Sequence, residues 1–147
     1  MKLLLGTKKK QIVQELHERF GVSRVDGLFL QFGKEKIRLY CGSLSREELT
    51  SLDSVLRLES VGLYFAKIQN DGVRLTLEGC EIVKDQITKN LLPISNEDAD
   101  RWFHGQDLAI AHEPAFKILT NNQDIIGCGK STGDRITNSL PKERRIR

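Results

Sequence analysis

The chain has 147 residues, enough for one large domain or two small ones, and roughly two-thirds of its unfolded surface can be buried without metal or disulfide staples. Its three cysteines lie far apart and are odd in number, which suits a reduced compartment. The net charge of +3 is too small to prove a polyanionic partner.

The chain opens with a short apolar run. The run from residue 1 stops at Gly6, and three lysines follow soon after. It is too short for a signal peptide, and no stretch approaches the ~20 apolar residues needed to span a bilayer. We therefore expect a cytoplasmic protein without a membrane partner.

A helix is predicted over residues 8–20. Thr7 is a suitable N-cap, and Gly21 stands at the position after the helix where glycine is favoured. The expected core stripe on one face of the helix consists of Ile12, Val13, Leu16 and Phe20.

Two strands and a second helix are predicted next. Residues 28–32 form an apolar run, and residues 36–40 alternate polar and apolar side chains, which is typical of a returning strand. Ser45 and Glu48 then have the spacing of a capping box, so a short helix should follow.

The first half closes with a predicted hairpin and helix. Residues 61–68 are apolar enough for a strand, residues 70–72 read Asn-Asp-Gly, and residues 73–77 alternate again. Asn-Asp-Gly favours a hairpin turn because glycine accepts positive φ. With a helix over 78–87, the first half is predicted to be an α+β unit that ends near residues 88–90.

The second half begins with a predicted strand over residues 91–94 and a short acidic helix. Ser95 or Asn96 caps this helix, and its early carboxylates suit the helix dipole. Gly105 should end the helix.

The rest of the second half is predicted to be strands. Residues 107–111, 115–120 and 125–130 have strand character, with a turn at 121–124, and a closing strand is expected from Arg135 onward. About five short strands around one helix favour a closed barrel, which leaves no exposed sheet edge.

Charge is distributed unevenly along the chain. The last twenty residues hold six basic side chains against Asp134 and Glu143, a local net charge of 6 − 2 = +4. This pattern fits an anion-binding edge, and it fits a solvated, frayed terminus equally well.

Known catalytic and metal motifs are absent. Gly129 to Thr132 resembles the end of a phosphate-binding loop, but Asp124 stands where that loop needs glycine, and too few residues remain for the helix that must follow. No closely spaced Cys or His pair could hold zinc, and no thiol has an activating context. We expect no enzyme activity, no metal and no cofactor.

Two adjacent aromatic side chains, Trp102 and Phe103, have alternative explanations. Exposed aromatic rings beside a basic edge can stack on bases. On a short helix packed over a barrel, however, these residues are more simply explained as core.

At this point the second half resembles a known family. Residues 102–108, a helix end running into a strand, resemble the opening of PUA domains in pseudouridine synthases and ribosome-assembly factors. The strand over 125–130 ends in the family's Gly-x-Gly, and residues 133–145 are similar to the C-terminal end of Fmu/Sun-type rRNA cytosine-5 methyltransferases. Ile126 replaces the usual proline, and Thr137 replaces a frequent lysine, which removes one phosphate-binding candidate.

The first half resembles the pre-PUA domain of Nip-type 60S ribosome-biogenesis factors through residues 60–67 and 73–77. Together the resemblances imply an α+β protein. A pre-PUA-like α+β domain (residues 1–90) would precede a small PUA-like RNA-binding β-barrel with one short helix (residues 91–147).

The resemblance implies binding of structured RNA, rRNA or tRNA, in ribosome biogenesis or RNA modification and without catalysis. The RNA would occupy a groove between the short helix and the final strand. Gly105 and Gly129 would allow the RNA backbone to approach, because neither has a Cβ, and the basic side chains would contact phosphates. The positions implied are Arg101, His104, Gly105, Gln106, Gly129, Lys130, Arg135, Lys142, Arg144 and Arg145.

A protein-interaction adaptor is the alternative. In that case the α+β half would hold a separate RNA-modification enzyme, a ribosome-assembly protein or a ribosomal protein, and the barrel would only support it. An exposed apolar patch on the first half and binding that ignores salt would favour this alternative.

Overall fold

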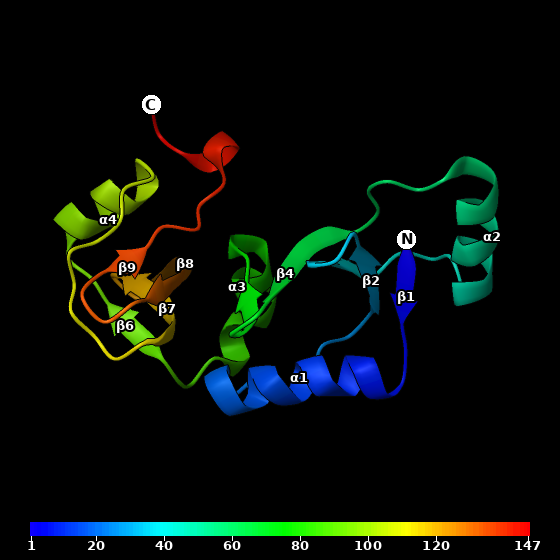
Figure 1. The fold of residues 1–147 in the computed structure, drawn as a ribbon, viewed down its shortest axis with the longest axis horizontal. Coiled ribbons are helices and arrows are strands. Elements are labelled where there is room, and N and C mark those ends of the chain that lie inside the picture. The colour runs from blue at the N-terminus through cyan, green and yellow to red at the C-terminus, as the bar shows by residue number, and fades with distance from the viewer.

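The computed structural model describes residues 1–147, which form two β-sheets with helices packed around them (Figure 1). In the first sheet every neighbouring pair of strands is antiparallel and the order follows the chain. Its strands are β1 (Lys2–Leu4), β2 (Leu28–Phe32), β3 (Lys36–Tyr40), β4 (Leu63–Gln69) and β5 (Gly72–Leu75). The opening apolar run, for which no strand was predicted, is the edge strand β1.

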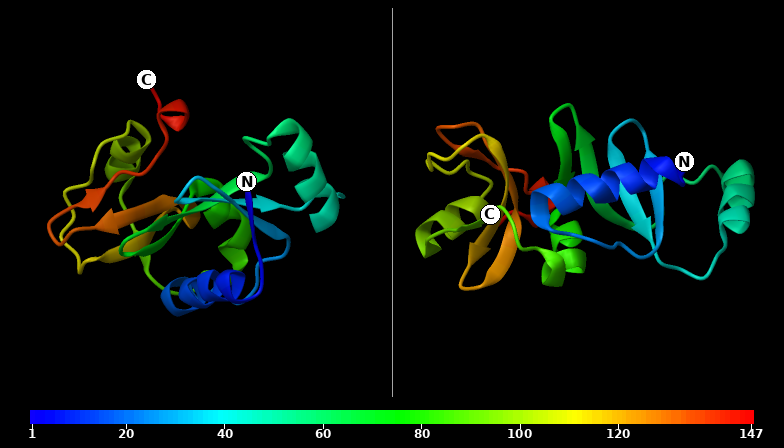
Figure 2. Two further views of the ribbon diagram at one scale, coloured as in Figure 1. Left: turned by 45° about the vertical axis from the view of Figure 1, so that its right-hand side comes forward. Right: turned by 90° about the horizontal axis from the view of Figure 1, so that it is seen from below.

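Helix α1 (Thr7–Phe20) packs on the first sheet and confirms the predicted helix and its core stripe (Figure 2). Gly21 has the expected left-handed conformation, with φ of 86°. The N-cap prediction was wrong: Gly6 is the cap, and Thr7 is already helical and makes no capping hydrogen bond. The first turn of α1 contains three lysines and no acidic residue, so the positive end of the helix dipole has no compensating negative charge there.

The predicted capping box is confirmed at the start of α2 (Arg46–Leu56). The Glu48 N–H donates to Ser45 Oγ over 3.1 Å, and the Ser45 N–H donates to Glu48 Oε2 over 2.7 Å. The helix stands apart from the sheet, beside β1, and Leu49 is its one buried residue (Figure 1).

The predicted hairpin joins β4 to β5. Gln69 pairs with Gly72, which has φ of 126°, so the Asn-Asp turn is as tight as expected. The next strand ends at Leu75 because Thr76 caps α3 (Leu77–Val83), its Oγ1 accepting the Gly79 N–H over 3.0 Å. The predicted helix thus starts one residue early, and it ends in a 3₁₀ turn over Lys84–Gln86.

The second sheet has the order β6–β7–β8–β9, with β6 parallel to β7 and the other pairs antiparallel. Helix α4 lies between β6 and β7 in the chain, and a 3₁₀ turn over Lys142–Arg144 precedes the C-terminus. The elements are β6 (Leu91–Pro93), α4 (Asn96–Phe103), β7 (Ala115–Asn121), β8 (Asp124–Ser131) and β9 (Ile136–Thr137).

The second sheet is curled, but it is not the closed five-stranded barrel that we predicted. Residues 107–111 form no strand, because the Ile110 N–H turns back to Leu108 O over 2.9 Å and leaves a single bridge from Leu108 to Ile136. The closing strand is only two residues long, and β6 and β9 are not paired. The structure shows a mixed α+β fold that is consistent with a PUA-like domain.

The two sheets share one hydrophobic core. Phe116, Ile118 and Cys128 of the second sheet pack in the same cluster as the core of α1 and the first sheet. A smaller cluster surrounds Trp102. The division into domains 1–90 and 91–147, and the pre-PUA identity of the first, stay proposals; the two parts are joined by buried apolar contacts.

Cys80 and Cys128 are buried and Cys41 is exposed. Burial raises the pKa of the Cys128 thiol to about 12, so that this side chain is a packing residue. No group of three or more His, Cys, Asp or Glu side chains is arranged to hold a metal ion. None of the helices combines the length and the apolar character that a membrane crossing requires.

Candidate nucleic-acid interface

Helix α4 is fixed to the second sheet by its tryptophan. The Trp102 side chain is fully buried, and its indole N–H donates to Ile126 O over 3.1 Å. Phe103 is half-buried against the same cluster. The core explanation is therefore confirmed for Trp102, whose ring is closed off from solvent, while Phe103 packs against the same cluster and stays partly exposed.

The C-terminal tail lies against the end of α4. The Ile146 N–H donates to Phe103 O over 2.8 Å, and Arg145 Nε donates to Leu140 O over 3.0 Å. Gly105 has φ of 83°, and a Cβ there would stand 2.5 Å from Arg145 Cδ. The open side of Gly105 is thus occupied by the Arg145 side chain, so RNA could approach this glycine only if that side chain moved.

Gly129 likewise makes room for protein atoms. A Cβ at this position would lie 2.5 Å from Ile136 Cγ2 and 3.1 Å from the Trp102 ring. Gly129 faces the small core beneath α4, so it offers no approach to RNA. Because β8 is an extended strand through Ser131, the Gly-Lys-Ser-Thr segment has no loop-to-helix geometry for binding phosphates.

The space between α4 and β9, where the RNA groove was expected, is bridged by Asn138. Its Nδ2 donates to Trp102 O over 2.8 Å and to Gln106 O over 2.9 Å, and its N–H donates to Asp107 Oδ1 over 2.8 Å. Arg135 lies 3.7 Å from the other oxygen of Asp107. Asn138 was not among the predicted positions, although an amide that pairs with backbone groups is typical of such junctions.

The predicted cations do not share one groove. Arg101 pairs with Asp98 over 2.9 Å within α4, His104 lies 3.7 Å from Asp100, Arg144 pairs with Glu78 of α3, and Lys130 pairs with Asp71 of the β4–β5 turn. In contrast, no carboxylate lies within ion-pairing distance of Lys142, Arg145 or Arg147. We call these three cations, with His104 and Gln106 at the end of α4, the tail edge.

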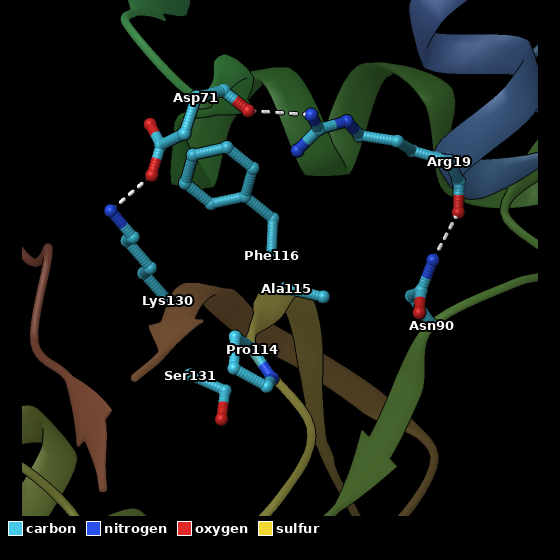
Figure 3. Close-up of a pocket in the computed structure, with 8 residues that line it drawn as sticks. All are labelled: Arg19, Asp71, Asn90, Pro114, Ala115, Phe116, Lys130 and Ser131. Carbon is cyan, nitrogen blue, oxygen red and sulfur yellow. Dashed lines mark hydrogen bonds and ion pairs between the residues drawn. The ribbon is translucent and has the colours of Figure 1, made fainter. Parts of the chain in front are cut away.

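A second polar region lies where the two sheets meet. Figure 3 shows the Asp71 carboxylate reaching Lys130, while the Asp71 carbonyl accepts Arg19 Nη2 over 2.6 Å. The Arg19 guanidinium also lies 5.0 Å from the centre of the Phe116 ring, and Asn90 Nδ2 donates to Arg19 O over 2.6 Å. These contacts surround a hollow of about 270 Å³.

A larger groove of about 780 Å³ adjoins the same ion pair. All ten residues that line it are polar or charged, and they come from the β2–β3 turn, the β4–β5 hairpin, and the segments of β8 and β9 with the residues that follow them. They are Glu35, Gln69, Asn70, Asp71, Arg74, Lys130, Thr132, Thr137, Asn138 and Ser139. We call this the inter-sheet groove.

Lys130 and Asp71 form an ion pair between the two sheets. The hydrogen bond from Lys130 is the main reason why the pKa of Asp71 lies below its usual value. Both side chains are nearly half exposed, at 44% for Lys130 and 42% for Asp71, so the pair is a solvent-screened contact. The hairpin motif showed a turn at Asp71, but nothing local to the motif could indicate its partner 59 positions further along the chain.

Comparison with known proteins places this region in context. Residues 89–146 match the family described as the methyltransferase RsmF PUA domain. The similar relatives are each named ribosomal RNA small subunit methyltransferase F. That of Psychromonas ingrahamii is 27% identical over 143 residues, which cover 92% of this chain and 28% of the relative.

Two further relatives give the same result. The Vibrio cholerae protein is 23% identical over 138 residues, covering 92% of this chain and 28% of its own. The Serratia proteamaculans protein is 32% identical over 98 residues, which cover 65% of this chain and 20% of that relative. The chain thus spans less than a third of these relatives. The resemblance to PUA-domain proteins and to the C-terminal region of Fmu/Sun-type rRNA methyltransferases is confirmed.

Proposed function

We propose that this PUA-domain chain binds structured RNA, and rRNA in particular, as part of rRNA modification, without itself being catalytic. The family match covers the PUA domain, and the matched relatives are named as methyltransferases of small-subunit rRNA. The observation that carries the proposal is the tail edge, where Lys142, Arg145 and Arg147 have no acidic partner. Unpaired cations of this kind bind phosphates by releasing counterions.

The ten positions that we predicted from the sequence enter this proposal with different roles. Lys142, Arg145, His104 and Gln106 would contact RNA at the tail edge. Arg101, Lys130, Arg135 and Arg144 would contribute only if RNA displaces their present carboxylates. Gly105 and Gly129 would act indirectly, through the Arg145 and Trp102 side chains packed on them.

Salt titration tests the proposal. If four cations contact phosphates, log K for a fluorescein-labelled small-subunit rRNA hairpin should fall with log salt at a slope of about −3 to −4. Changing the tail-edge cations Lys142, Arg145 and Arg147 together to Ala should flatten this slope by about 2 to 3, and Lys142→Ala alone by about 0.7 to 0.9. The Lys142 side chain makes no hydrogen bond or ion pair, so its single variant should fold normally.

A matched control removes the same charge from the first half. Lys10, Lys34 and Arg46 are exposed and lack ion-pair partners. Their triple Ala variant should keep the slope within about 0.5 of the wild-type value. If the tail variant and this control flatten the slope equally, the attraction is a general charge effect and the tail edge is not the site.

A second candidate function, protein-interaction adaptor, is favoured by one observation. Large apolar side chains are exposed on the first half, most strongly Val55, Leu56 and Leu63 at 79%, 65% and 54%. Such side chains are typical of contacts between proteins when they are grouped. Binding of a protein through this half should be nearly independent of salt, which distinguishes it from RNA binding at the tail edge.

A further inference from the structure

The inter-sheet groove contains a basic side chain without a partner, Arg74 of β5. Arg74 is half-buried, and its guanidinium makes no hydrogen bond or ion pair within the chain. Every other lysine or arginine that is buried or half-buried donates to an oxygen atom of the protein. Arg74 is the exception, and a charged group that is partly removed from water is costly unless it finds an acceptor.

The sheet directs Arg74 toward the groove. Val73 and Leu75, its neighbours in β5, are buried in the shared core, so the Arg74 side chain projects from the opposite face of the strand. None of its nitrogen atoms is sealed off from solvent. The unused N–H groups of Arg74 are therefore open to whatever occupies the groove.

The two carboxylates that line the groove are already engaged. Glu35 pairs with Lys67 over 3.1 Å, and Asp71 pairs with Lys130. Lys67 also stands directly opposite Arg74 in the β4–β5 pair, and like charges at such positions destabilise a sheet. Three cations against two carboxylates leave a local charge of 3 − 2 = +1, which an anion bound in the groove would neutralise.

The other groups in the groove suit a nucleotide. No apolar side chain lines it, so an apolar ligand would gain no contact there. The amide side chains of Gln69 and Asn70, at the hairpin beside Arg74, make no hydrogen bond within the chain. Polar side chains of this kind hydrogen-bond the edges of unpaired bases, and a guanidinium binds phosphate through two parallel N–H groups.

The groove adjoins the tail edge. Asn138 lines the groove, and its Nδ2 donates to the carbonyl of Gln106, which belongs to the tail edge. A strand that is bound at the tail edge can therefore continue past Asn138 into the groove. The groove volume of about 780 Å³ lies within the ~300 to 1,000 Å³ of pockets that hold small molecules, which favours nucleotides of a single strand over a double helix.

We propose that the inter-sheet groove binds an unpaired segment of RNA, with a backbone phosphate on Arg74 and base edges on Gln69 and Asn70. The proposal rests on the RNA-binding function put forward above and adds the class of RNA, a structured element with an adjoining single strand. Arg74 lies outside the residues that match the PUA family, so the first half of the chain takes part in recognition. It supplies a fourth phosphate contact beside the three cations of the tail edge.

The test compares two RNAs on the intact chain by fluorescence anisotropy. One is the labelled small-subunit rRNA hairpin, whose loop is unpaired, and the other is its stem alone as a blunt duplex. Arg74→Gln should weaken binding of the hairpin by about 10-fold or more and flatten its salt slope by about 0.7, because one charged contact is lost. Binding of the blunt duplex should change less than about 2-fold, and Arg74→Lys, which keeps the charge, should keep the salt slope.

Two controls separate this contact from a general charge effect and from a role in folding. Arg46→Gln removes the same charge from an exposed arginine of α2 that has no ion pair, and it should leave binding of both RNAs within about 2-fold. Arg74→Gln should keep or raise the Tm, because the repulsion from Lys67 disappears. A lower Tm with equal loss of both RNAs would show that Arg74 holds the fold, and it would overturn the proposal.

Three further outcomes overturn the single-strand proposal. They are hairpin binding by Arg74→Gln within about 2-fold of the wild type, equal weakening of hairpin and duplex, or displacement of the hairpin by ~1 mM uridine monophosphate but not by inorganic phosphate, which would make a free nucleotide the occupant. In each case a wild-type salt slope that Lys142→Ala flattens leaves the proposed function standing. A wild-type chain that binds neither RNA in a salt-dependent way overturns the proposed function as well.

Discussion

The ion pair between Lys130 and Asp71 offers a sharp test of where RNA binds. Asp71→Asn removes the negative charge while keeping the size of the side chain. The bond from Arg19 is kept too, because it ends on the backbone carbonyl of Asp71. Since both members of the pair are nearly half exposed, the free energy of unfolding should change by less than about 1 kcal/mol.

The effect on RNA should be larger and should depend on salt. If RNA reaches the inter-sheet groove, the freed Lys130 adds one phosphate contact, and the slope of log K against log salt steepens by about 0.7 to 0.9. Between ~50 and ~200 mM salt the advantage of the variant should therefore shrink about threefold. Fluorescence anisotropy with the labelled rRNA hairpin measures both quantities.

Two variants complete the experiment. Lys130→Gln added to Asp71→Asn should abolish the steeper salt slope. Glu78→Gln frees Arg144 from its ion pair in the same way, and its effect on the salt slope shows whether RNA reaches Arg144. A slope for Asp71→Asn equal to that of the wild type, in a folded protein, would refute the idea that RNA enters the inter-sheet groove. The tail edge alone would then carry the binding.

Three more predictions follow from particular contacts. Gly105→Ala should destabilise the protein by about 1 to 3 kcal/mol, seen as a lower Tm, because φ is positive and the tail must move; an unchanged Tm would contradict this packing. As pH falls through the folded pKa of Asp71, which lies below its usual value of 3.8, its contribution to stability should disappear, whereas Asp71→Asn should lack this component of acid unfolding. A maleimide should label Cys41 in the native protein, and Cys128 only after denaturation; rapid native labelling at Cys128 would show that the shared core opens.

Features determined by neighbouring residues were predictable from the sequence. Three such features formed as predicted, because each depends on contacts within a few positions. They are the capping box at Ser45, the β2–β3 strand pair and the Asn-Asp-Gly hairpin that joins β4 to β5. The PUA resemblance was also carried by local motifs. These short-range signals describe most of the secondary structure, including helix α1 and its core stripe.

Features determined by distant contacts were not predictable. The expected strand over residues 107–111 has the right composition, but the backbone bond within it and the hydrogen bonds of Asn138 hold it as a loop. The side chains that occupy the space beside Gly105 and Gly129 come from the tail, from α4 and from β9, all distant contacts that the local sequence does not indicate. The partner of Lys130 likewise depends on how the two sheets pack.

The core shared between the sheets has a mechanical consequence. Phe116 lies under the guanidinium of Arg19, and Cys128 packs among side chains of the first sheet, so the two halves cannot turn on each other without exposing apolar surface. Along the longest axis of the molecule, α2 lies at one end and α4 with the tail at the other (Figure 1). Motion of the tail edge relative to α2 should therefore be small.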